Sequence, residues 1–265
     1  MDWIKLPFTL TTLTATLSLS ILAIANLPTK VQAGDRQATF AEKYPNGWQI
    51  SQTYVPPNRD APTSTLGGAS RGICLDNAEL LKSLMPANNL AFTTQDYPTL
   101  YWYIPKSTAK ALELEVRYGK DESTWQKRTF TVPIATGVVS VNLQNSNLPP
   151  LKVGETYHWF FRMVCRDTTA NDSGDRSGDA IVEGWIERVE ANDLAQKLES
   201  VAPNDRPAVY AEAGIWQDSL SSLAELIRTN PNDRTLTVKW EKLLKSAGLD
   251  ELVDKPLVDC CTASK

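Results

Sequence analysis

The chain has 265 residues and a formal net charge of -4, so its length allows one large domain or two small ones. The acidic balance argues against a nucleic-acid partner, because nucleic acids require a basic surface. The four cysteines match no zinc-binding spacing, and no glycine loop ends in the Lys-Ser or Lys-Thr that binds phosphate, so we expect neither a metal nor a cofactor.

The first 33 residues have the pattern of a cleaved signal peptide. A basic residue, Lys5, precedes an apolar run over residues 6–27, and small residues lead up to Ala33. We predict cleavage after Ala33, with a second candidate site after Ala25. The alternative is an uncleaved membrane anchor, but five threonines and two serines make the hydropathy of the run modest for a permanent span. We therefore expect a periplasmic or secreted protein with no membrane span after cleavage.

A segment rich in proline and glycine follows, over residues 34–75. Between residues 56 and 73 it holds three prolines and three glycines, which favour an extended loop over a helix or a paired strand. The next residues, 76–85, have the composition of a short helix, which Pro86 would end.

Six runs then alternate with a period of two, as expected for half-buried strands. The runs are residues 98–105, 111–119, 123–133, 137–143, 155–165 and 180–189. Only short turn signals separate them, so we predict an antiparallel β-sandwich over residues 76–189, similar to immunoglobulin and fibronectin type III domains. Gly154 and Tyr157 have the spacing of a tyrosine corner, which gives Tyr157 a structural role.

From residue 190 the apolar residues recur at helical spacing, which predicts a helical module over residues 190–255, followed by a polar tail over residues 256–265. One set of residues matches a tetratricopeptide-like helix pair. The set is Tyr210, Gly214, Trp216, Leu223 and Pro231. Because the pattern occurs once, the pair must pack on neighbouring helices or on the sandwich. The expected fold class is therefore α+β, a sandwich followed by helices.

Cys74 and Cys165 lie within patterned sequence, and an exported chain tends to pair such cysteines. We predict a disulfide between them that holds the glycine loop before Cys74 against the sandwich. The alternative is two separate thiols. Cys260 and Cys261 are adjacent, and a disulfide between neighbours is strained, so their role stays open.

Several motifs, in the order in which they occur, resemble a known family. They are LGGASRGIC, PTLYWYIP, YHWFFRMVC and VEGWIERV, followed by the helical stretch YAEAGIWQDSLSSLAEL. Together they resemble the cyanobacterial family called domain of unknown function 928, over residues 50–250. The resemblance implies an exported cyanobacterial protein and no particular activity. The sequence departs from the family pattern at Asp60, at Ala69–Ser70 and in the acidic stretch 168–175.

The stretch from Gly68 to Gly72 fits the G-x-S-x-G pattern of a hydrolase, with Ser70 as the nucleophile and His158, the single histidine of the chain, as its base. That motif needs an apolar strand before it and a helix after it, whereas a run of Pro, Thr and Ser precedes it here. We therefore interpret the glycines as serving close backbone approach and expect no catalytic residues. A hydrolase using Ser70 and His158 is the alternative.

The stretch 167–179 contains four aspartates and two glycines, and carboxylates on a loop can bind calcium. Its spacing does not match an EF-hand loop, so a solvated loop between strands is the preferred interpretation.

Four strand residues are candidates for a ligand platform, because they lie on the face opposite the expected core. They are Tyr101, Tyr103, His158 and Phe160. If their strands pair, these side chains form one aromatic patch that suits a sugar. The alternative is packing, for example under the C-terminal helices, which is the more common role of aromatic residues on strands. We expect a non-catalytic extracytoplasmic binding or interaction module, with a protein or another envelope component as its partner. A purely structural envelope protein is a third interpretation.

Overall fold

The computed structural model describes residues 52–62, 69–76, 79–119, 122–146, 148–166, 176–191 and 193–261. The expected signal peptide and its cleavage positions lie outside these residues, as do residues 167–175 of the acidic stretch. Within the described part, none of the helices combines the length and the apolar character that a membrane crossing requires.

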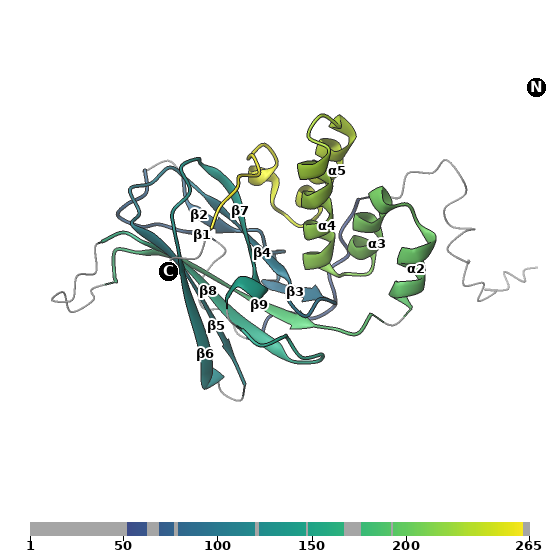
Figure 1. The fold of residues 1–265 in the computed structure, drawn as a ribbon, viewed down its shortest axis with the longest axis horizontal. Helices are drawn as coiled ribbons and strands as arrows, with labels where there is room; N and C mark the ends of the chain where they lie inside the picture. Colours follow the sequence, from purple (N-terminus) through teal and green to yellow (C-terminus); the bar gives the residue numbers. More distant parts are fainter. Residues whose placement is uncertain are drawn as a thin grey trace, which may run out of the picture. The chain divides into compact units, whose positions relative to one another are not determined.

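The strands of the described residues form two sheets (Figure 1). The strands are β1 (Ala69–Ser70), β2 (Leu81–Ser83), β3 (Leu90–Thr93), β4 (Thr99–Ile104), β5 (Ala111–Tyr118), β6 (Thr124–Phe130), β7 (Gly137–Asn142), β8 (Thr156–Val164) and β9 (Ala180–Arg188). A four-stranded sheet has the order β1-β2-β4-β7, and a five-stranded sheet has the order β3-β9-β8-β5-β6. Neighbouring strands are antiparallel, except that β3 and β9 run parallel. The fold is therefore α+β with two mostly antiparallel sheets, as predicted.

Aromatic side chains fill the space between the two sheets. The Trp102 ring of β4 stacks on the Phe161 ring of β8, with centroids 4.0 Å apart, and it meets the Trp159 ring edge-on at 5.6 Å. All three side chains are buried. The period of two in β4 and β8 places these residues on the inward faces, as the sequence predicts.

All six predicted strands are present, with ends within three residues of those predicted. The predicted helix over residues 76–85 is wrong, because residues 81–83 form β2 and pair with β4. So short a run forms no stable helix by itself, whereas the paired conformation buries Leu81 and Leu84 in the core. Strands β1 and β3 were missed because, at two and four residues, they are too short to show a period.

The hydrogen bond expected for a tyrosine corner is present where the chain enters β8. The backbone N–H of Lys152 donates to the Tyr157 hydroxyl at 3.0 Å, across a turn in which Gly154 has a φ of +78°. Glycine adopts this left-handed conformation with little strain. Burial raises the pKa of Tyr157, so its hydroxyl stays neutral in this structural role.

Cys74 and Cys165 are paired as predicted, with their Cα atoms 5.0 Å apart. Gly72 lies two residues before Cys74, and only a residue without a side chain fits there. A Cβ atom at Gly72 would lie 2.7 Å from the backbone nitrogen of Ala180 in β9. This contact agrees with the interpretation of the glycine loop as a segment that lies close against the sandwich.

Helices follow the strands in the chain. They are α2 (Leu194–Ser200), α3 (Arg206–Glu212), α4 (Trp216–Thr229) and α5 (Arg234–Ser246), with the 3₁₀ helices η3 (Pro203–Asp205) and η4 (Asp250–Leu252). One further 3₁₀ helix, η2 (Leu143–Ser146), lies earlier, between β7 and β8. Figure 1 shows α4 next to β3 and β4, and both α3 and α5 pack against α4. Trp216 at the start of α4 is buried, and its Nε1–H donates to the Leu84 carbonyl at 2.8 Å. This bond joins the helices to the four-stranded sheet.

Residues 52–57 pack on the pair formed by α3 and α4. The Tyr54 ring lies 4.9 Å from the Trp216 ring, and the Val55 N–H donates to the Ala211 carbonyl at 3.0 Å. Gly214, between the two helices, has a φ of +75°, and a Cβ atom there would lie 3.0 Å from the Val55 carbonyl oxygen. The chain's own N-terminal segment thus occupies part of the surface of this helix pair.

The C-terminal segment completes one edge of the four-stranded sheet. The Val138 N–H of β7 donates to the Pro256 carbonyl at 2.7 Å, and the Val258 N–H donates to the Val138 carbonyl at 2.9 Å. Further along this segment, Cys260 and Cys261 lie within disulfide distance of each other, a pairing that the sequence did not favour. The predicted polar tail is therefore paired with β7 over its first residues.

Candidate functional site

The four candidate platform residues lie on two different sheets. Tyr101 and Tyr103 belong to β4 in the four-stranded sheet, whereas His158 and Phe160 belong to β8 in the five-stranded sheet. Because Trp102 and its partners on β8 meet between the sheets, the outward side chains of the two strands point away from each other. The single aromatic patch that paired strands would create does not form.

His158 is held by carboxylates from two elements. Its Nδ1 lies 3.0 Å from Glu122 Oε1, and its Nε2 lies 3.2 Å from Glu183 Oε2. The ring stacks on Trp185, with centroids 3.9 Å apart. Ser70, the nucleophile of the hydrolase alternative, belongs to β1 in the other sheet. Both ring nitrogens face carboxylate oxygens rather than a serine hydroxyl, which a catalytic base would need to contact.

Phe160 packs among neighbours on the outer face of the five-stranded sheet. The Arg117 guanidinium lies 4.4 Å from the centre of its ring, and the His158 ring lies 4.2 Å away. Arg117 also pairs with Glu115, with Nε 2.6 Å from Oε1. A guanidinium over an aromatic ring is a favourable contact in itself, so these interactions explain Phe160 by packing.

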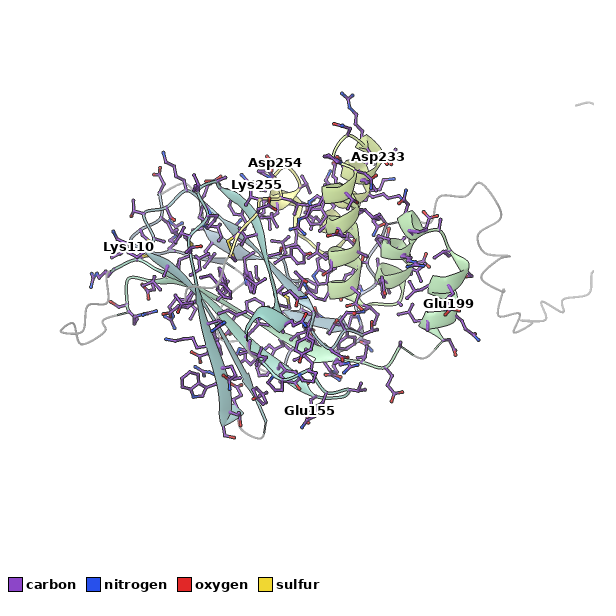
Figure 2. All side chains as sticks on the ribbon, in the orientation of Figure 1. Lys110, Glu155, Glu199, Asp233, Asp254 and Lys255 are labelled. Carbon is purple, nitrogen blue, oxygen red and sulfur yellow. A yellow bond between two sulfur atoms is a disulfide. The ribbon has the colours of Figure 1, made fainter. Side chains whose placement is uncertain are left out.

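Tyr103 lines a small cleft of about 280 Å³ together with Glu79 and Lys255. Its hydroxyl donates to Glu79 Oε2 at 2.6 Å, and Lys255 Nζ donates to Glu79 Oε1 at 3.0 Å. Burial, helped by Glu79, raises the pKa of Tyr103 to about 12, so the hydroxyl is a neutral donor. Figure 2 shows Lys255, which reaches this network from the C-terminal segment. Tyr103 therefore helps to hold that segment on β4.

A larger cleft, with a volume of about 520 Å³, lies between α4 and the outer face of β4 and β7. This helix–sheet cleft is lined by Gln95, Tyr97, Pro98, Thr99, Tyr101, Ser140, Asn142, Tyr210, Asp218, Ser221, Ser222, Glu225 and Arg228. Of the four platform candidates, only Tyr101 lines it. Its volume falls in the range of about 300–1,000 Å³ that is usual for small-molecule sites.

The polar character of the cleft comes from one side of α4. The apolar residues Trp216, Leu220 and Leu223 of this helix are buried. The residues of α4 that line the cleft recur every three or four positions from Asp218 to Arg228, so they share the opposite side. Small hydroxyl side chains on this side, instead of large apolar ones, leave space between the helix and the sheet.

Asp218 fixes one end of the cleft. Its Oδ1 accepts a hydrogen bond from the Thr93 hydroxyl at 2.5 Å, and its Oδ2 accepts from the Thr94 N–H at 2.9 Å and from the Thr94 hydroxyl at 2.5 Å. Burial raises the pKa of Asp218, and these hydrogen bonds act in the opposite direction. The carboxylate is therefore occupied in tying α4 to the segment that follows β3.

Tyr101 forms the buried part of the cleft, with 4% of its surface exposed. Burial raises the pKa of its hydroxyl, whereas the neighbouring Ser221 and Arg228 act in the opposite direction. Arg228 Nη2 donates to the Ser140 hydroxyl at 3.0 Å. The Ser221 hydroxyl is buried beside Tyr101 and acts on the pKa of Tyr101 as a hydrogen-bonding neighbour.

The rim of the cleft carries two half-buried tyrosines, Tyr97 and Tyr210, and the exposed Glu225. Tyr97 precedes β4 and its carbonyl accepts a hydrogen bond from Asn142 Nδ2 at 2.9 Å, while Tyr210 comes from α3. Burial raises the pKa of the Tyr210 hydroxyl, with a smaller effect in the same direction from Asp218. The rim thus offers two aromatic rings and a carboxylate to anything that enters.

Within the residues that the structure describes, no group of three His, Cys, Asp or Glu side chains is arranged to hold a metal ion. Residues 167–175, most of the stretch considered for calcium, lie outside those residues.

The sequence carries only a weak signal for the cleft. Residues 218–228 carry hydroxyl and charged side chains at helical spacing. A polar stripe on a helix is ordinarily a solvated face, so its position over a sheet could not be inferred from the spacing.

A family model described as Domain of Unknown Function (DUF928) matches residues 66–257. The matched region includes both sheets, the four α-helices and every residue that lines the helix–sheet cleft. No curated protein matches the chain.

Proposed function

The chain belongs to the family called Domain of Unknown Function (DUF928), and for this member we propose a non-catalytic binding function in the cell envelope, with the ligand in the helix–sheet cleft. The lining of the cleft carries the proposal. It combines hydroxyls, tyrosine rings, amides and a guanidinium near a carboxylate, and it includes neither a histidine nor a cysteine. Such a set of side chains holds and orients a small polar ligand.

The contacts within the cleft favour binding over hydrolysis. A serine nucleophile needs a base within hydrogen-bond reach. The Ser222 hydroxyl instead donates to the backbone carbonyl of Asp218 at 2.7 Å. The Asp218 carboxylate accepts from Thr93 and Thr94, which leaves it poorly placed to remove a proton from a substrate.

The helix pair is a second surface for a partner, since its residues match the tetratricopeptide-like pattern. We prefer the cleft because residues 52–57 already pack on that pair. Tyr210, one residue of the pattern, contributes to the cleft instead. An immunoglobulin-like arrangement of the two sheets is part of the same proposal, and the hydrogen bond of Tyr157 supports it.

The envelope location rests on the sequence pattern of residues 1–33 and agrees with the Cys74–Cys165 pairing, since oxidising compartments preserve disulfides. Export predicts a mature N-terminus at Gly34, which N-terminal sequencing of the protein from its native source would reveal. An intact Met1 on the soluble protein would contradict cleavage.

Binding is tested with the wild-type protein and with variants that change the cleft. Glu225→Ala and Arg228→Ala each remove a charged group from its lining, and Glu241→Ala removes an exposed carboxylate of α5 as the matched control. Purified envelope polysaccharide and envelope peptides serve as separate probes in thermal-shift and calorimetric titrations. At least one probe should raise the melting temperature, because a ligand that binds only the folded state stabilises it.

The effect should disappear in the two cleft variants and persist in Glu241→Ala. Equal binding by all three variants would contradict the assignment to the cleft. Release of smaller products from a probe by the wild-type protein would show an enzyme instead.

A further inference from the structure

We propose that the ligand of the helix–sheet cleft is an uncharged saccharide, packed on the rings of Tyr97 and Tyr210 and hydrogen-bonded by polar groups of α4. The inference rests on the proposed binding function and names the chemical class of its ligand. Four features of the cleft support it: its backbone, its charge, its buried hydroxyls and its tyrosine rim.

The backbone of β4 beside the cleft has little to offer a peptide. Strand β4 is paired with β2 on one side and with β7 on the other. Where β2 ends, the Tyr101 carbonyl accepts a hydrogen bond from the Leu84 N–H at 3.0 Å. The Thr99 carbonyl accepts from the Gln217 side chain. A peptide could therefore not add as a strand beside β4, where recognition depends on side chains.

The charges of the lining disfavour an anion. Glu225 contributes an exposed carboxylate, and Arg228 contributes the one guanidinium of the lining. That guanidinium already donates to the Ser140 hydroxyl and lies near Tyr101. A phosphate or a uronate would find no excess of positive charge to offset its own charge in this partly desolvated site. An uncharged ligand needs no such compensation.

The hydroxyl groups of the cleft disfavour an apolar ligand. Ser140, Ser221 and Ser222 are among the lining residues, and an apolar ligand would displace water from such a lining without replacing its hydrogen bonds. Saccharide hydroxyls both donate and accept hydrogen bonds. They can therefore bond the serine hydroxyls of the cleft in either direction, accept from the Arg228 guanidinium and donate to the Glu225 carboxylate.

The rim supplies the aromatic surface that sugars require. Tyr97 and Tyr210 are half-buried and come from different elements, so their rings are held in place by the surrounding fold. The C–H face of a pyranose ring packs on an aromatic ring, while its hydroxyls stay free at the edges. This combination of ring and hydroxyl recognition distinguishes a saccharide from the peptide, anion and apolar classes.

The test uses the mature protein and four defined probes. Maltotriose and the trimer of N-acetylglucosamine are neutral saccharides, a trimer of galacturonic acid is an anionic one, and trialanine is a peptide. Calorimetric titration measures the dissociation constants for the wild type, Tyr210→Ala and Tyr210→Phe. Tyr118→Ala is the control, because Tyr118 is a partly buried tyrosine of β5 that does not line the cleft. Circular dichroism establishes that each variant is folded.

At least one neutral trisaccharide should bind more tightly than the galacturonic acid trimer and trialanine. Tyr210→Ala should weaken that binding at least tenfold, and Tyr210→Phe should restore it to within about twofold, since the ring and not the hydroxyl makes the contact. Tyr118→Ala should bind like the wild type.

Preferential binding of the anionic trimer or of trialanine, lost in Arg228→Ala, would overturn the ligand class and leave the binding function of the cleft standing. Neutral saccharide binding that neither Tyr210→Ala nor Arg228→Ala changes would overturn the site. Failure of both neutral probes, while an envelope fraction still binds through the cleft, would overturn the saccharide inference alone.

Discussion

Trp216→Ala should destabilise the sandwich and the helices together, because Trp216 joins them. Its side chain has 0% of its surface exposed, and its Nε1–H donates to the Leu84 carbonyl at 2.8 Å, next to β2. Its ring also lies 4.9 Å from that of Tyr54 in the N-terminal segment. One side chain of α4 thus contacts two other parts of the chain that are far apart in sequence.

The expected magnitude follows from these contacts. Truncating a buried tryptophan to alanine costs about 3–5 kcal/mol of the free energy of unfolding. Trp216→Phe retains most of the apolar volume but leaves the Leu84 carbonyl without its donor, which costs about 1–3 kcal/mol. In a chain of this length 1 kcal/mol shifts the melting temperature by about 2–4 °C, so the alanine variant should melt about 6–20 °C lower.

Urea unfolding measured by far-UV circular dichroism gives the free energy of each variant. Val238→Ala is the control, because this side chain of α5 is 48% exposed, and it should change the free energy by less than about 0.5 kcal/mol. A loss below about 1 kcal/mol for Trp216→Ala would refute the reasoning, since no tightly packed core loses so little. Separate unfolding transitions for helices and sheets would refute the claim that this residue joins them.

Cys74→Ser should lower the free energy of unfolding by about 2–5 kcal/mol, because the bridge to Cys165 closes a long loop; equal stability under oxidising conditions would contradict the bridge. Ser70→Ala should change stability by less than about 0.5 kcal/mol if the loop serves only backbone approach. Covalent labelling of Ser70 by a fluorophosphonate would instead support the hydrolase. Burial raises the pKa of Asp218 in the folded protein above its unfolded value of about 3.9. The protonated carboxyl therefore stabilises the fold fully below the unfolded pKa, and this stabilisation is lost as the pH rises through the higher folded pKa. Urea titrations from about pH 4 to pH 7 should therefore show the wild type losing stability relative to Asp218→Asn, whereas parallel curves would show that the carboxyl does not titrate in this way.

The sequence by itself determined the main strands, the cysteine pair and the tyrosine corner. These features depend on local patterns. Alternating residues on a strand must face opposite sides, so Trp102 and Phe161 were placed in the core correctly. The turn before Tyr157 needs a glycine in the left-handed conformation, which Gly154 supplies two residues after Lys152.

The alternation of apolar and polar residues did not determine which strands are neighbours in a sheet. The predicted aromatic platform required β4 and β8 to be neighbours. Tyr101 and His158 both face away from the space between the sheets, as the pattern indicated, but their strands belong to different sheets and both side chains are buried. Pairing between strands depends on contacts distant in sequence, and a single sequence carries no direct record of them. The same limit applies to β2, where pairing with β4 overrode a composition typical of a helix.

Only the tertiary structure decided that a cleft exists. Tyr101 and Arg228 are more than a hundred positions apart, and they meet because Trp216 and Asp218 fix α4 to the segments beside β4. The sequence shows that one side of α4 is polar, which is equally true of a helix side that faces water. Whether such a side faces solvent or covers a sheet depends on how the helix docks, and docking is set by buried contacts between distant residues.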